Sequence, residues 1–137
     1  MPISRGVLDA WLADLRDPAN QSLQGRGCLR SVDDKFCCLG RLANIVDPEG
    51  WSNPDPTAPS MWKHTKGQGY LGTNSFPEPH DIFIRPDLIP VEVQEKLSDL
   101  NDGNGSGSRP ALPFPRIADT IEELVASGQI PVVDDPS

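Results

Sequence analysis

The sequence predicts a small α+β domain with about four short helices, a small antiparallel sheet or hairpin, and long loops rich in proline and glycine. Four segments repeat apolar residues at helical spacing, whereas only short stretches alternate as strands do. The 15 Pro and 12 Gly supply about a fifth of the 137 residues, above the usual share of about 12%. Because a chain of this length suits one domain with one modest core, we expect residues 1–137 to form a single domain.

The first predicted helix spans residues 7–16. Ser4 suits its N-cap, and the Asp17-Pro18 pair ends it, since the residue before a proline disfavours the helical conformation. Residues 19–26 follow as a polar loop. The apolar stripe of this helix consists of Val7, Leu8, Trp11, Leu12 and Leu15.

A hairpin that leads into a second helix comes next. Cys28–Arg30 and Lys35–Cys37 have the pattern of short strands around a turn at residues 31–34. The helix spans about residues 38–46 and ends at the turn residues Asp47–Gly50. Its buried stripe is expected to be Leu39, Leu42, Ala43 and Val46.

The segment 51–88 is an irregular excursion rich in proline and aromatic residues. Residues 81–85 alternate well enough for one strand, and residues 61–64 and 69–71 are weaker candidates. A structureless stretch of this length is uncommon inside a compact domain. We therefore expect either a functional excursion or a small irregular sheet.

The last third of the chain predicts two further helices. The first, residues 90–101, carries Pro90 in its first turn, and a flexible loop at residues 103–113 follows it. The second, residues 115–127, has the clearest periodicity in the chain. Residues Ile130–Val133 suit a short strand. The stripes consist of Val93, Leu97 and Leu100 in the first helix and of Ile117, Ala118, Ile121, Leu124 and Val125 in the second.

The chain is strongly acidic, with a formal net charge of −8. An acidic surface repels phosphate backbones, so direct nucleic-acid binding is not expected. The same charge suits docking on a basic surface, although a net charge away from zero is also ordinary for soluble domains. The chain opens without an export signal, contains no apolar run of the roughly 20 residues that a membrane span needs, and has an odd number of cysteines. These features predict a protein of the reducing cytoplasm, without membrane contact.

Two blocks of sequence carry a resemblance to known proteins. The first combines Trp11 and Leu15-Arg16 with Gly27-Cys-Leu-Arg30 and Phe36-Cys-Cys-Leu-Gly40; the second combines Leu97-Ser-Asp-Leu-Asn-Asp102 with Phe114-Pro-Arg-Ile-Ala-Asp-Thr-Ile-Glu122. Together they resemble a group of small tailed-phage and prophage proteins of uncharacterised activity. Residues 41–44 lack the third cysteine that this group often has, and Pro113 stands where the group tends to have serine. The resemblance implies a phage or prophage origin and no particular reaction.

Cys37 and Cys38 are the candidates for covalent chemistry. A thiol at a helix N-terminus can act as a nucleophile, but it needs a helper that His64 and His80 do not offer in a recognisable motif. The alternative is a pair of small buried hydrophobic side chains where the hairpin meets the helix. A structural zinc on Cys28, Cys37, Cys38 and His64 would lack the usual C-x2-C spacing. We therefore expect no enzyme activity, no cofactor and no metal.

The function that the sequence favours is that of a phage accessory protein that binds and inhibits a host protein or protein complex. A component of an antiviral defence system is a plausible target, which would make the chain an anti-CRISPR or similar anti-defence protein. Acidic and aromatic loop residues suit such an interface, although Asn101-Asp102 also fits a plain helix C-cap. The expected partner-binding residues are Asp33, Asp34, Glu49, Trp51, Asp55, Trp62, Tyr70, Asn101 and Asp102.

Two alternatives remain open. The first is a protein that binds or sequesters a small ligand such as a nucleotide signal, which would require clustered cations for the phosphate. The second is an interaction module stapled by zinc on the cysteines and histidine named above. The local cationic cluster for the first alternative consists of Arg26, Arg30, Lys35 and Arg41.

Overall fold

The computed structural model describes residues 2–25, 29–30, 34–52, 63–64, 67–70, 80–84, 87–103 and 111–134. The helices in this part of the chain are α1 (Arg5–Arg16), the 3-10 helix η1 (Pro18–Leu23), α2 (Cys38–Val46), α3 (Val91–Asp102) and α4 (Phe114–Ala126). The strands are β1 (Ile3–Ser4), β2 (Trp51–Ser52), β3 (Lys63–His64), β4 (Gly67–Tyr70), β5 (His80–Ile84) and β6 (Val132–Val133). The expected mixture of helix and strand is confirmed, and helix predominates.

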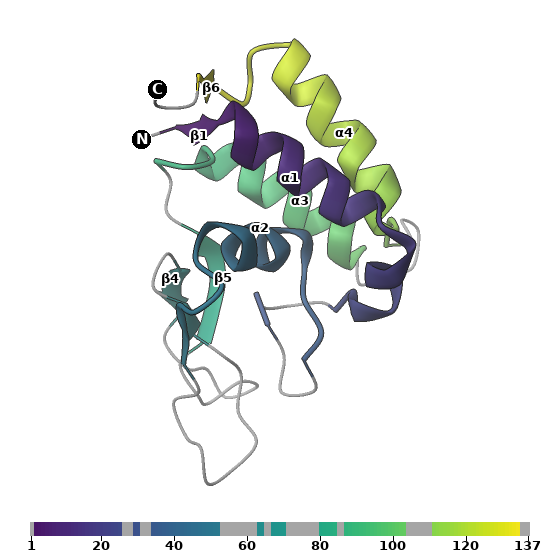
Figure 1. The fold of residues 1–137 in the computed structure, drawn as a ribbon, viewed down its shortest axis with the longest axis vertical. Helices are drawn as coiled ribbons and strands as arrows, with labels where there is room; N and C mark the ends of the chain where they lie inside the picture. Colours follow the sequence, from purple (N-terminus) through teal and green to yellow (C-terminus); the bar gives the residue numbers. More distant parts are fainter. Residues whose placement is uncertain are drawn as a thin grey trace, which may run out of the picture.

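The four α-helices enclose a common core (Figure 1). α1 packs against α2 and α4, and α3 packs against the same two helices. The predicted apolar stripes face inward, and burying one large aliphatic or aromatic side chain contributes about 1.5–3 kcal/mol. The fully buried large side chains of the helices are Trp11, Leu15, Leu39, Leu42, Leu97, Phe114, Ile117 and Ile121.

The ends of α1 follow the expected signals. The Ser4 side chain accepts a hydrogen bond from the backbone N–H of Val7, which confirms the predicted N-cap. The helix ends at Arg16, before Asp17-Pro18. The polar loop expected after it is wrong in part, because residues 18–23 form η1. Pro18 suits the first turn of that helix, and the Asp17 carboxylate caps it by accepting from the N–H of Ala19 at 2.9 Å.

The small sheet that joins the two ends of the fold is parallel, so the prediction of an antiparallel sheet is not matched there. β1 pairs with β6, with Ile3 opposite Val132. α4 runs back toward the start of α1 (Figure 1), and the chain then reverses at Gly128, whose φ is +81°. The reversal sets β6 alongside β1 in the same direction. Two separate pairs, β2 with β3 and β4 with β5, are antiparallel.

Among the described residues of the hairpin expected at Cys28–Cys37, single bridges occur in place of two strands. Phe36 makes single bridges to two different neighbours, a parallel one to Gln24 and an antiparallel one to Arg30. Since Gly25 and Leu23 already bond the backbone of Phe36, the second ladder does not extend. Asp34 adopts the left-handed conformation, with φ of 62°, which reverses the chain just before this point.

Gln94 on α3 holds the end of β5. Its side chain is 1% exposed; Oε1 accepts from the N–H of Ile84 at 2.9 Å, and Nε2 donates to the carbonyls of Ile84 and Ile89. The amide thus serves as the hydrogen-bond partner that a neighbouring strand would otherwise provide. These hydrogen bonds connect the end of β5 and Ile89 to α3 in the helical core.

Replacing Gln94 by leucine is expected to lower the free energy of unfolding by about 3 kcal/mol, because three buried backbone groups lose their partners. Urea unfolding of the wild type and the variant measures this difference. Glu95→Leu, at the adjacent exposed position of α3, is the matched control, and its effect should stay within about 0.5 kcal/mol. Equal midpoints for the Gln94 variant and the wild type would show that the clamp contributes nothing.

Candidate functional site

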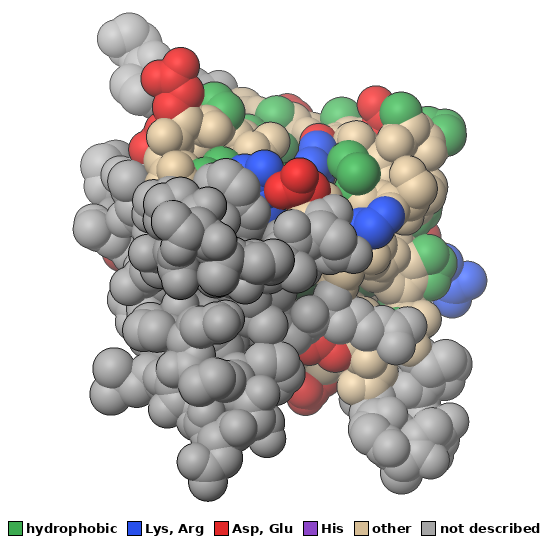
Figure 2. Space-filling view, turned by 90° about the horizontal axis from the view of Figure 1, so that it is seen from below, with side chains coloured by type: hydrophobic (Ala, Val, Ile, Leu, Met, Phe, Trp, Pro, Cys, Tyr) green, Lys and Arg blue, Asp and Glu red, His purple; other side chains and the backbone are tan. Residues whose placement is uncertain are grey.

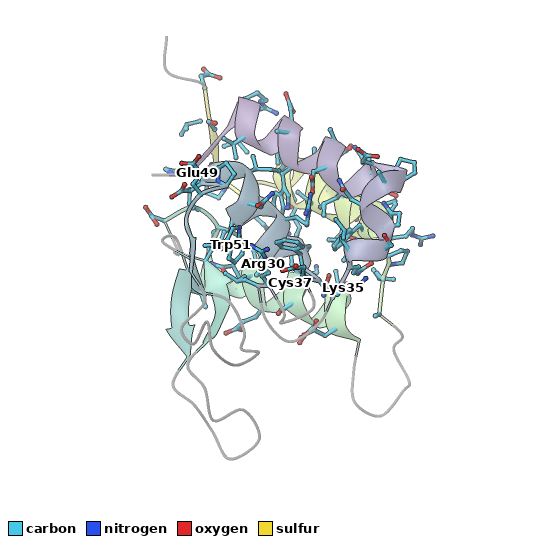
Figure 3. The ribbon with its side chains drawn as sticks, turned by 60° about the horizontal axis from the view of Figure 1, so that its bottom comes forward. Arg30, Lys35, Cys37, Glu49 and Trp51 are labelled. Atoms are coloured by element: carbon cyan, nitrogen blue, oxygen red, sulfur yellow. The ribbon has the colours of Figure 1, made fainter. Side chains whose placement is uncertain are left out.

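Two arginines and two aromatic rings stack beside the start of α2. Arg41 lies over one face of Phe36, with Cζ 4.9 Å from the ring centroid, and the Arg30 guanidinium lies 5.3 Å from the same centroid. Arg30 also lies 5.5 Å from the Trp51 ring, which meets Phe36 edge to face at 5.7 Å. We call Arg30, Phe36, Arg41 and Trp51 the arginine–aromatic cluster; Arg30 and Trp51 are labelled in Figure 3. Each cation–π contact at a partly exposed position contributes about 0.5–1 kcal/mol.

The inner side of the cluster is anchored in the core. The Arg41 guanidinium binds both carboxylate oxygens of Asp14 on α1, at 2.7 and 2.6 Å, and the two side chains are 9% and 17% exposed. A bidentate pair of this kind fixes the plane of the guanidinium. Phe36 is 7% exposed, and both guanidinium groups lie over its ring. The cluster is therefore rigid on the side that faces the helices.

The outer side of the cluster is partly open. Trp51 is half-buried, and its indole N–H donates to Oδ1 of Asn44 at 3.1 Å. The Arg30 side chain is 19% exposed and pairs with Asp34, whose own side chain is 61% exposed. Glu49 is exposed two residues before Trp51. In Figure 3 the labelled residues Arg30, Trp51 and Glu49 follow one another along this side of the molecule.

The structure brings three of the expected partner-binding residues into one region. Asp34 and Trp51 both contact Arg30, and Glu49 precedes Trp51 on the same connection after α2. Figure 2 shows acidic and basic side chains next to each other where the described surface meets the grey atoms. Outside the described residues lie Asp33, Asp55 and Trp62, while Tyr70 is described only as part of β4.

The expectation that Asn101 binds a partner is wrong, because the fold places its side chain out of a partner's reach. The residue is fully buried. Its Oδ1 accepts from the N–H of Cys38 and from Gln24, and its Nδ2 donates to the carbonyl of Gly25 and to Asp102. The side chain ties the end of α3 to the start of α2 and to the residues after η1. Asp102, which is half-buried, supports this junction.

Three of the four cations of the ligand-binding alternative already have partners within the fold. Arg41 is 7% exposed and engaged by Asp14, so its assignment to a phosphate is wrong. Arg30 pairs with Asp34, and the Lys35 ammonium donates to the carbonyl of Ser22 at 2.5 Å. Arg26 lies outside the described residues. A bound phosphate would have to compete with these partners.

The two adjacent cysteines, Cys37 and Cys38, cap α2 and fill the core, respectively. Cys37 is 3% exposed and caps α2, because its Sγ accepts from the N–H of Gly40 at 3.4 Å. Cys38 is completely buried and its Sγ contacts the Leu97 carbonyl at 3.8 Å. Burial, then the neighbouring Cys37, raises the pKa of the Cys38 thiol well above its ordinary value. The thiol of Cys38 is therefore protonated at neutral pH and is a poor nucleophile.

No group of three metal-binding side chains occurs among the residues that the structure describes. Of the expected zinc ligands, Cys28 lies outside the described residues and His64 is described only as part of β3. Cys37 and Cys38 point into helix-capping and core positions, as described above. The zinc alternative therefore stays a prediction, because one of its four ligands lies outside the described residues.

Two residues of the site, Phe36 and Asp14, and Gln94 at the end of β5 were missed from the sequence. Asp14 and Gln94 act through partners 27 and 10 positions away in the chain, and Phe36 contacts side chains from three different segments. Asp14 lies on the polar side of a predicted amphipathic helix, where a carboxylate is ordinarily solvated. The one available signal was the phenylalanine directly before the two cysteines, which stands between two arginine-containing segments.

Comparison with protein-family models, with curated proteins and with solved structures gives no significant match. Within the described ranges, none of the helices combines the length and the apolar character that a membrane crossing requires.

Proposed function

We propose that this chain is a binding protein that docks a partner through the outer side of the arginine–aromatic cluster. The observation that carries the proposal is the half-buried Trp51, stacked with Arg30 and fixed by Asn44. Tryptophan and arginine are enriched among the residues that dominate binding energy, and anchors that are already held lose little entropy on binding. The exposed carboxylates Asp34 and Glu49 would form an acidic rim around this anchor.

The partner that fits this surface is a basic region of a protein. The chain has a net charge of −8, which speeds the approach to a positively charged surface and opposes an acidic one. The resemblance to tailed-phage proteins supports a host protein of antiviral defence as that partner, with the chain acting as its inhibitor in the cytoplasm. Proteins that handle nucleic acids carry basic surfaces of the required kind.

The test is retention of a host protein from a cell lysate by the tagged full-length chain, with each variant compared at increasing salt. Trp51→Ala should weaken binding about 30-fold if the side chain is a central anchor. Glu49→Lys should reduce retention at low salt and should flatten the dependence on salt, since it removes an attraction that ions screen. The retained protein is identified by mass spectrometry, and its affinity is then measured with purified components.

Glu123→Lys is the matched control, because it makes the same charge change at an exposed position of α4. Its effect should be limited to the small loss that follows from the lower net charge. Equal retention by the wild type and by both the Trp51 and Glu49 variants would contradict the proposed surface. Retention of no host protein at any salt concentration would contradict the proposed function itself.

A further inference from the structure

A groove of about 510 Å3 runs between α1 and α4. The floor combines aliphatic and small side chains, with Leu12 and Val125 half-buried and Ala13 and Ala126 exposed. Small residues at such positions let another helix approach closely. The groove belongs to a different part of the molecule from Trp51 and Arg30, which do not line it.

The exposed face of α1 has a charge pattern that is complementary to itself. Asp9 and Arg16 both line the groove, and they lie seven residues apart, with Leu12 and Ala13 between them. Seven residues are about two helical turns, so the four side chains share one face. When a second α1 lies antiparallel across Leu12 and Ala13, Asp9 of each copy meets Arg16 of the other.

We propose that this groove is the contact surface of a symmetric homodimer. A twofold axis near Leu12 and Ala13 makes the interface isologous, so every favourable contact occurs twice. The α1–α4 pair of one copy then packs on the α1–α4 pair of the other, in the arrangement of a four-helix bundle. Because the two α1 helices run antiparallel, the positive N-terminal end of each faces the negative C-terminal end of the other.

The charged groups that this contact needs are available. Asp9 is exposed and makes no ion pair with any residue that the structure describes. Arg16 is 38% exposed, and its Nη2 contacts Asp119 and Glu122 of α4. A guanidinium has five N–H donors, so Arg16 can hold these two carboxylates and also donate to the Asp9 carboxylate of the second copy.

Arg5 adds to the complementarity. It is exposed and lines the groove one turn before Asp9. In the antiparallel arrangement it lies toward the C-terminal end of the other α1, where Asp119 and Glu122 leave one negative charge after pairing with Arg16. A helix from an unrelated protein would match this order of charges only by chance, whereas a second copy matches it by symmetry.

The experiment is sedimentation equilibrium of the full-length chain over a range of concentrations. The mass is expected to rise from 14.9 kDa toward twice that value as the concentration increases. Asp9→Lys should weaken the dimer at least about tenfold, since two lysines then face two arginines across the axis. Ala13→Glu should abolish it. Circular dichroism of each exposed-site variant checks that the fold is kept.

The control is Glu95→Lys, which makes the same charge change on the exposed surface of α3. It lowers the repulsion between two acidic copies, so its dimer should be as strong as the wild type or slightly stronger. Ala13→Cys should form an intermolecular disulfide on oxidation, whereas Glu95→Cys should not. A wild-type chain that stays monomeric would leave the groove to a helix of another protein and would overturn the proposal. A dimer that responds equally to Asp9→Lys and Glu95→Lys would overturn it as well.

Discussion

Replacing Gly40 by alanine is expected to lower the free energy of unfolding by about 3 kcal/mol or more, because the added methyl group would overlap neighbouring backbone atoms. A Cβ at this position would lie 1.8 Å from the carbonyl oxygen of Leu29 and 2.7 Å from its carbonyl carbon. Both are backbone atoms, so no side-chain rotation relieves the overlap. The first turn of α2 would have to move away from Leu29, which is fully buried.

The expected sign at Gly40 is the opposite of the usual one. Glycine inside a helix is normally about 1 kcal/mol less favourable than alanine, so an open site would gain stability from the change. Gly128→Ala is the control: nothing lies within 4 Å of the added Cβ, and the only penalty comes from its φ of +81°. Denaturant unfolding should show a loss of about 1 kcal/mol there. A Gly40→Ala protein as stable as the wild type would mean that Leu29 does not approach α2 as described.

The second large effect is expected at Asn101. Asn101→Leu removes all four hydrogen bonds of a fully buried amide, and leaves the N–H of Cys38 and the carbonyl of Gly25 without their side-chain partner. The loss in the free energy of unfolding should be about 3–4 kcal/mol, since each buried group left unsatisfied costs about 1–3 kcal/mol. Asp99→Leu, at an exposed position of the same helix, controls for the introduced leucine.

Asn101→Asp keeps the size and shape of the side chain but removes its N–H donors, so it tests the contribution of those donors apart from that of shape. The aspartate keeps the acceptor for Cys38 but, when ionised, faces the Gly25 carbonyl and the Asp102 carboxylate with like charge. Burial and Asp102 should raise its pKa in the folded state above the unfolded value. The deficit relative to the wild type should therefore be smallest at low pH, should grow as pH rises from the unfolded pKa to the folded pKa, and should be constant above it. Urea unfolding at several pH values measures this trend, and a deficit independent of pH would contradict it.

The helices could be predicted because their signals are local. The stripes of α1 and α4 each repeat within one segment, and Ser4, through its side-chain oxygen, and Pro18, through its ring, mark the ends of α1. β1 and β6 could not be predicted as a pair. Each has only two residues, and Ile3 meets Val132 across nearly the whole length of the chain. No periodicity extends over so short an element.

Residue type selects candidates for a binding surface without placing them. Trp51, Asp34 and Glu49 are candidates as loop aromatics and acids; Trp51 and Asp34 contact Arg30 in the structure, and Glu49 lies two residues before Trp51. Asn101 was selected by the same logic, but its amide is used inside the fold. Sequence alone does not distinguish the two cases, because exposure depends on which segments pack across the residue. Gln94 shows the converse, since nothing in its neighbourhood marks a polar side chain as buried.

The pairing of β1 with β6 has a consequence for the order in which the fold can form. A chain synthesised from its N-terminus completes α1 long before α4 and β6 leave the ribosome. Contacts between such distant segments slow folding, because the intervening chain must close first. Until then α1 lacks its contacts with α4 and β6. The native state is therefore completed in a late step, and a nascent chain halted before Ile130 lacks the last buried residue among those that the structure describes.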